Sequence, residues 1–231
     1  MSGQAGPEIS IRTIGFPPYG IHIDQTFSGI YFDLANALAT EAGFLANNSV
    51  SPYARIISEL KSGHTDMTIM FRYPELEEHV VYVVPLPPLK TVVIGRSGTV
   101  FDSLDSLKNK KIAYLRGASF SDAIDEDSSI IKQRTADFLQ GVRMMMAGRV
   151  DAIIGPMDPI LSAAAKINRG AESFGEPFVV SERTPWIQVS KRGKHLQSVE
   201  TLETAFNALQ SRGVLTQLHE KYLAPNRTVG Q

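Results

Sequence analysis

One short order of elements occurs twice in this chain: an amphipathic helical pattern, a Gly-x-x-Asp sequence and a run of β-prone residues. In the first copy, residues 63–66 lead into a run at 67–71, and about 85 residues later residues 148–151 lead into a run at 151–154. A helix that leads directly into a strand is typical of α/β folds with largely parallel sheets. The repetition therefore predicts two lobes of similar α/β construction.

Two further runs indicate how the lobes are connected. Residues 91–98 and 186–193 are both extended apolar segments that end in a basic, glycine-containing turn. If both are crossover strands, residues 95–186 form an inserted lobe, and residues 1–94 with 187–231 form a discontinuous first lobe. Two lobes joined by two adjacent strands predict a hinge with a ligand cleft between them.

Composition narrows the possible functions. The 231 residues carry 23 Lys and Arg against 24 Asp and Glu, so nothing indicates binding to nucleic acid or an anionic membrane. The absence of cysteine excludes disulfides and thiolate metal sites, and the five histidines lack a metal-binding spacing. We therefore expect no metal and no cofactor. The first six residues look like an expression leader, so we expect a natural export signal to have been removed.

Local signals predict where the main elements start and stop. Apolar spacing predicts a helix from Tyr31 that ends at Gly43, and Gly63 ends a second helix. Strands are predicted at 8–14, 67–71 and 110–115. Helix starts are expected at Ser51 with Pro52, at Ser119, at Thr135 and at Asp158 with Pro159.

The loops that follow the predicted strands are the candidate ligand-binding segments. In open α/β sheets, ligands bind outside the carboxyl ends of the strands. This rule selects residues 16–19, 71–73, 116–119 and 155–158. The candidate binding residues there are Phe16, Tyr19, Phe71, Arg72, Tyr73, Arg116, Gly117, Ser119 and Asp158.

The order of motifs resembles the bacterial extracellular solute-binding proteins of family 3. The resemblance runs from Ile9 to about Leu223 and rests on residues 16–19, 29–35, Tyr53 with 60–66, 103–112, 148–152 and 213–223. It implies a type II periplasmic-binding fold that captures a small solute outside the cytoplasm and delivers it to the permease of an ABC transporter. It also implies a monomer without catalytic residues. By position, Tyr53 matches the ligand-stacking aromatic, Phe16 and Tyr19 match the first loop's aromatics, and Gly117 with Ser119 match the anion-binding turn.

Two departures from the family affect the ligand. Amino-acid binders have a Thr-x-x-Arg segment whose arginine holds the α-carboxylate, but residues 73–79 contain no arginine. They also place an aspartate for the α-ammonium where this chain has Pro156. Arg72, Arg55 or Arg116 are candidate replacements for the carboxylate contact, since a guanidinium can bind a carboxylate from another loop. Asp158 is a candidate for the ammonium contact, with helix capping as its alternative role.

Several hypotheses remain open at this point. Tyr19, Tyr53, Phe120 and Trp186 are candidate ligand contacts, and core packing is the alternative for each. The first function hypothesis is capture of a small polar, acid-bearing solute for transport. The second is a ligand-sensing input domain of a membrane signalling protein. The third is an enzyme similar to cyclohexadienyl dehydratases, in which Glu75 would be the general acid.

Overall fold

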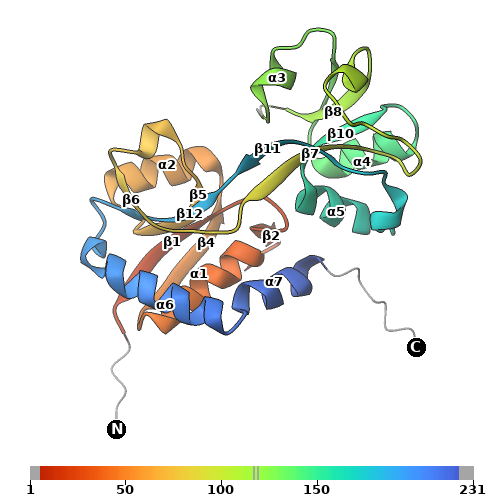
Figure 1. Cartoon of the computed structure of the whole chain (residues 1–231). Coiled ribbons are helices and arrows are strands. Elements are labelled where there is room, and N and C mark those ends of the chain that lie inside the picture. Colours follow the sequence, from red (N-terminus) through yellow and green to blue (C-terminus); the bar gives the residue numbers. More distant parts are fainter. Residues whose placement is uncertain (1–5, 117, 119, 224–231) are drawn as a thin grey trace, which may run out of the picture. The chain divides into compact units, whose positions relative to one another are not determined.

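The structure is a computed structural model that describes residues 6–116, 118 and 120–223. The chain divides into two compact units (Figure 1). Unit 1 contains the described residues up to Pro87 and those from Thr184 onward, whereas unit 2 is the continuous stretch from Pro88 to Arg183. The predicted lobe limits at 94/95 and 186/187 stay a prediction, because a division into compact units does not locate a hinge.

Unit 1 consists of a five-stranded sheet, a small hairpin and helices on both faces of the sheet. Its elements are β1 (Glu8–Ile14), β2 (Ile21–Ile23), β3 (Thr26–Ser28), α1 (Ile30–Glu41), β4 (Leu45–Ser51), α2 (Tyr53–Ser62), β5 (Met67–Phe71), η1 (Pro74–Leu76), β6 (Val80–Pro85), β12 (Pro185–Ser190), η4 (Leu196–Ser198), α6 (Val199–Ser211) and α7 (Val214–Leu223). The sheet order is β4-β1-β5-β12-β6. Helices α1, α6 and α7 gather on one side of this sheet, and α2 covers the other (Figure 1).

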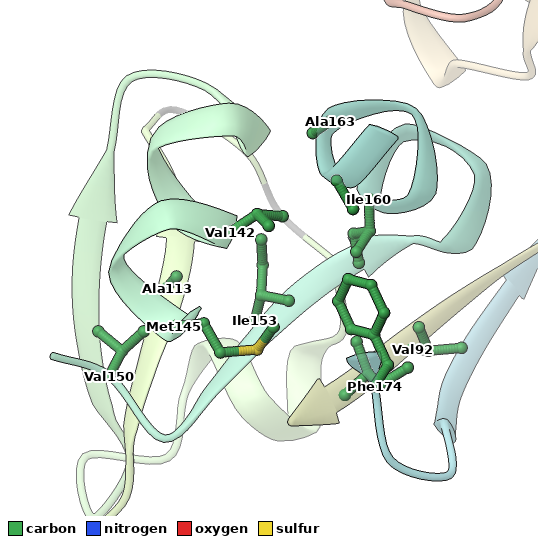
Figure 2. Close-up of a cluster of buried hydrophobic side chains, with 11 residues drawn as sticks. Val92, Ala113, Val142, Met145, Val150, Ile153, Ile160, Ala163 and Phe174 are labelled. Atoms are coloured by element: carbon green, nitrogen blue, oxygen red, sulfur yellow. The ribbon is translucent and has the colours of Figure 1, made fainter. Parts of the chain in front are cut away.

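Unit 2 repeats this construction with a second five-stranded sheet. Its elements are β7 (Leu89–Gly95), η2 (Asp105–Leu107), β8 (Lys111–Leu115), α3 (Asp122–Asp125), β9 (Ile131–Thr135), α4 (Phe138–Met146), β10 (Ala152–Pro156), α5 (Met157–Ala165), η3 (Ala171–Ser173) and β11 (Phe178–Arg183). The sheet order is β11-β7-β10-β8-β9. Figure 2 shows Val142 and Met145 of α4 beside Ile153 of β10, in a core that also includes Ile160 of α5.

The α/β fold class predicted from the sequence is confirmed, but the sheets are mixed rather than mostly parallel. In unit 1, β4, β1 and β5 are parallel, and β12 is antiparallel to both β5 and β6. In unit 2, β10, β8 and β9 are parallel, and β7 is antiparallel to both β10 and β11. The two antiparallel strands, β7 and β12, are those that begin directly after the chain passes from one unit to the other. Local sequence patterns do not show this long-range arrangement.

The repeated Gly-x-x-Asp sequence has the same structural role in both units. The backbone N–H of Asp66 donates to the carbonyl of Ser10 over 2.9 Å, and its carboxylate accepts the N–H of Ser10 over 2.9 Å. Asp151 makes the same pair of bonds with Lys111, at 2.7 and 2.8 Å. Each aspartate thus joins the start of its strand to the neighbouring parallel strand, so the motif sets strand pairing.

Two of the predicted helix starts are wrong. Ser51 and Thr135 are the last, buried residues of β4 and β9, and the N-caps are Pro52 and Asp137. Asp137 accepts the N–H of Gln140 over 2.7 Å, which is the bond that Thr135 was expected to make. Helix α5 begins one residue before Asp158, with Pro156 as its N-cap, and Ser119 lies outside the described residues.

Candidate functional site

The carboxyl ends of the three parallel strands of unit 1 meet at one edge of its sheet. Ile14 of β1 is opposite Ser51 of β4, and the register of β1 with β5 brings Phe71 to the same edge. Because β12 is antiparallel, its first residues lie at this edge too, with Pro185 opposite Phe71. We call this the unit 1 edge. It gathers the predicted site residues Phe16, Tyr19, Tyr53, Phe71, Arg72, Tyr73 and Trp186.

Arg72 lies against two aromatic rings at the unit 1 edge. Its guanidinium carbon is 4.2 Å from the ring centre of Tyr82 and 5.6 Å from that of Trp186. The two rings meet edge to face, with 5.9 Å between their centres. A cation over an aromatic face is attracted by the ring's electron density, so the two rings restrain the guanidinium.

Tyr82 is a member of this cluster that the sequence analysis missed. It belongs to a run of valines in β6 that reads as an ordinary strand. Its position becomes visible only through the register, in which β6 pairs with β12 and Tyr82 lies opposite Gln188. A pairing between residues so far apart in the chain leaves no local signal.

Tyr53 and Glu75 form a second polar contact at this edge. The Tyr53 hydroxyl donates to Glu75 Oε1 over 2.6 Å, and the Tyr53 ring packs edge to face on Tyr73 with 4.7 Å between the centres. The hydrogen bond from Tyr53, together with the nearby ammonium of Lys61, lowers the pKa of Glu75. A carboxyl group with a lowered pKa is ionised at neutral pH, which works against Glu75 as a general acid.

Phe16 and Tyr19 lie in the first loop, but their surroundings differ. The Tyr19 ring is buried, at 1% exposure, and packs on Tyr31 of α1 with 4.5 Å between the centres. Phe16 is partly exposed and stacks on Tyr19 at 6.2 Å. The carbonyl of Tyr19 also accepts the N–H of Tyr31. This placement favours packing for Tyr19, and its ligand role stays a prediction.

Arg55 is engaged on the surface of α2. Its Nε lies 2.7 Å from Glu59 Oε1, one helical turn away, and Glu59 also receives Arg12 at 2.9 Å. Partial burial opposes ionisation of Glu59, but hydrogen bonds from Arg55 and Thr65 lower its pKa overall. This ion-pair network accounts for Arg55 without a ligand, and its binding role stays a prediction.

The corresponding edge of unit 2 carries fewer described candidates. Arg116 follows β8, is exposed, and donates its backbone N–H to the carbonyl of Thr135 over 2.9 Å. Asp158 lies in the first turn of α5, directly after β10. Gly117 and Ser119, the predicted anion-binding turn, lie outside the described residues.

Phe120 is held at this edge through its backbone. Its N–H donates to Tyr114 Oη at 3.2 Å and to Asp125 Oδ2 at 3.1 Å, and its carbonyl accepts the Ser181 hydroxyl at 2.7 Å. Burial, and then a short hydrogen bond to Asp125, raise the pKa of Tyr114, so this hydroxyl stays protonated. The Phe120 ring packs between Tyr114 and Phe138.

Within residues 6–116, 118 and 120–223, no three His, Asp or Glu side chains converge as metal ligands. In that same part of the chain, no helix combines the length and the apolar character that a membrane crossing requires.

Solved structures show the same fold in binding proteins and in a sensor. An ancestral arginine-binding protein bound to arginine is 20% identical, with a TM-score of 0.69 over 96% of this chain and 100% of that one. The GluR0 ligand-binding core from Nostoc punctiforme in complex with L-glutamate is 18% identical, with a TM-score of 0.70 over 94% and 100%. A histidine kinase sensor domain with similarity to periplasmic binding proteins is 16% identical, with a TM-score of 0.69 over 96% and 98%. At these identities the likeness concerns the fold.

Sequence comparison identifies the family. No curated protein sequence matches the chain. The model of the bacterial extracellular solute-binding proteins, family 3, matches residues 10–225, which is nearly the whole length. This chain therefore belongs to the family 3 bacterial extracellular solute-binding proteins, and its role is to bind a solute.

Proposed function

We propose that this protein captures a small polar solute that carries an acidic group, without catalysing a reaction. In this proposal it acts outside the cytoplasm and delivers the solute to the permease of an ABC transporter. The observation that carries the acid-bearing class is Arg72, whose guanidinium lies over Tyr82 and near Trp186 at the unit 1 edge. A guanidinium can bind a carboxylate through two parallel N–H bonds, and the edges that carry these N–H groups are not the face that stacks on an aromatic ring.

The neighbouring residues support a solute of limited size. Tyr53 and Tyr73 add aromatic surface beside the end of β5, and such surfaces line most small-molecule sites. The segment after Arg72 is acidic, with Glu75, Glu77 and Glu78. Arg72 is the one basic residue between positions 72 and 78. A single arginine in this setting favours one acidic group on the solute over several.

The structural neighbours support the same class of ligand. Their names describe binding of arginine and of L-glutamate, both of which carry a carboxylate. In this chain the family arginine of the Thr-x-x-Arg segment is absent, so we assign its role to Arg72, with Arg116 as a further candidate. The proposal includes related organic acids as well as amino acids.

Calorimetry tests the ligand class. The purified protein is titrated with single amino acids, dicarboxylates and small monocarboxylic acids, and Trp186 emission is recorded in parallel, since Trp186 is the single tryptophan. We expect saturable heat and a change in emission with at least one acid. The absence of heat across the panel, with heat from neutral or cationic solutes instead, would overturn the acid-bearing class.

A sensory role is the second candidate, favoured by the likeness to a histidine kinase sensor domain. In that case binding of the solute would alter contacts with an output domain. The gene and its neighbours distinguish the two roles. A membrane span and a kinase domain in the same reading frame support sensing, whereas adjacent permease genes support transport.

A further inference from the structure

We propose that Tyr82 is a positioning residue that aims Arg72 at the carboxylate of the solute. The inference rests on the proposed function, because it assigns Arg72 as the acid-binding group. Tyr82 lies on β6, in the part of the edge farthest from the loops that follow β1 and β4. Its ring is the platform over which the Arg72 guanidinium lies, at 4.2 Å.

The aromatic platform restrains Arg72 more than its exposed ion pair with Glu77 does. The Arg72 side chain is 49% exposed, and its ion pair with Glu77 spans 3.4 Å between two exposed groups. Exposed ion pairs of this kind contribute little, since water competes for both partners. A long arginine side chain loses much rotamer freedom when it is fixed, so a prearranged guanidinium binds an anion more tightly than a mobile one.

The Tyr82 ring is itself firmly placed. It packs against the core formed by α2, β5 and β6, where Ile56, Leu60 and Met70 are buried. Its edge meets Trp186 on β12. Tyr82 therefore provides a rigid surface, and Trp186 limits the guanidinium on a second side.

Gln188 fixes the strand end from which Arg72 projects. Its side chain is fully buried, and its amide nitrogen donates to the carbonyls of Met70 and Phe71 at 2.8 and 3.1 Å. Gln188 also lies opposite Tyr82 in the sheet. One buried residue thus ties the backbone next to Arg72 to the strand pair that carries its platform.

The hydroxyl of Tyr82 is not part of this arrangement. Tyr82 Oη is buried and has no hydrogen-bond partner among the described residues. A buried hydroxyl without a partner costs free energy, so it does not anchor the ring. The positioning therefore comes from the aromatic face, and phenylalanine at this position must serve as well.

The test separates the ring from the hydroxyl and from general stability. Tyr82→Phe keeps the ring, Tyr82→Leu removes it, and Val84→Ala on the same strand controls for loss of packing. The Arg72 Nε–H resonance is assigned by NMR with Arg72→Lys, and binding is measured by calorimetry with two solutes that carry one carboxylate each, L-glutamine and propionate. If Tyr82→Leu does not fold, pentafluorophenylalanine at position 82 replaces it, because that residue keeps the ring shape but removes the attraction for a cation.

We expect the Arg72 resonance to show a ring-current shift in the wild type and in Tyr82→Phe, and to lose most of it in Tyr82→Leu, where the more distant Trp186 ring remains. Binding of a carboxylate probe is expected to weaken about fivefold to tenfold in Tyr82→Leu and to be restored in Tyr82→Phe. An unshifted resonance in the wild type, or unchanged binding in a folded Tyr82→Leu protein, would overturn the proposal. If the wild type binds neither probe, binding is measured instead with the acid that the calorimetric panel identifies; if no acid binds, the solute class is overturned, while the resonance still decides whether Tyr82 positions Arg72.

Discussion

Gly63, which ends α2, lies against the backbone of Arg192 so closely that a Cβ atom on it would be 2.4 Å from the Arg192 carbonyl oxygen. Gly63 also has φ +82°, a conformation that residues with a side chain rarely adopt. Both facts require glycine here. The C-terminal end of α2 is therefore in close contact with the segment that follows β12, although that segment belongs to the C-terminal part of the chain.

Gly63→Ala is expected to lower the free energy of unfolding by about 2–4 kcal/mol, because the left-handed backbone and the close carbonyl both oppose a methyl group. Gly43→Ala is the matched control, since Gly43 has the same φ but nothing within 4 Å of the added atom. The control should lose only about 1 kcal/mol. Urea denaturation of both variants measures the difference, and equal losses would show that the Arg192 contact does not matter.

Asp66→Ala is expected to cost more stability than Asp151→Ala, although both occupy the same motif. Asp66 is buried and accepts two backbone N–H groups, from Ser10 and from Lys194 at 2.8 Å. Asp151 is exposed and accepts one. We expect losses of about 2–4 kcal/mol and about 1 kcal/mol respectively, because unpaired buried donors are the larger penalty. Thermal and urea unfolding check the order, and a larger loss for Asp151→Ala would contradict it.

Tyr53→Phe is expected to raise the pKa of Glu75 towards its ordinary value, because the hydroxyl bond is the largest cause of the lowering. With a lowered pKa in the folded state, the ionised carboxylate stabilises the protein at neutral pH, and this contribution is lost as the pH falls through that pKa. Carbon NMR titration of the Glu75 carboxyl measures the change. Lys61→Met should raise the pKa less, and a titration of Glu75 that is unaltered in Tyr53→Phe would refute the assignment.

Arg72→Ala is expected to weaken binding of an acid-bearing solute by about 1.5–3 kcal/mol, the usual contribution of a hydrogen bond to a charged group. Arg55→Ala should leave binding unchanged, because Arg55 is paired with Glu59. Calorimetry with the acid that binds the wild type compares the two variants. Equal weakening in both would place Arg55 in the site, and no weakening in Arg72→Ala would remove Arg72 from it.

Local sequence signals predicted an element well where its limits depend on residues close by in the chain. Strand β1 has the alternating burial of a half-buried strand, β5 is a short run whose first four residues are buried, and α2 ends at a left-handed glycine, Gly63. Helix starts were less predictable. Ser51 and Thr135 are of residue types that often cap helices, but they are the last residues of β4 and β9. Threonine is favoured both in strands and at helix N-caps, and only the sheet decides between the two for Thr135.

The candidate site could be predicted only in part, for the same reason. Arg72 and Tyr53 follow strands directly, so the rule for carboxyl ends finds them. Tyr82 escaped that rule because its partners are Trp186 on β12, the neighbour of β6 in the sheet, and Arg72 after β5, which lies on the far side of β12. The burial of Tyr19 could not be predicted from the sequence either, since it depends on how α1 packs against the first loop.

The sheet order of unit 1 has a consequence for the synthesis of the protein. Strand β12 lies between β5 and β6, yet the ribosome makes it only after the whole of unit 2. Unit 2 can complete its sheet once Arg183 has emerged, whereas β6 must wait for residues 185–190 before it has a neighbour. We therefore expect unit 2 to fold first. Until β12 has been made, the N-terminal strands have an unpaired edge, and at this stage the nascent chain depends most on protection from aggregation.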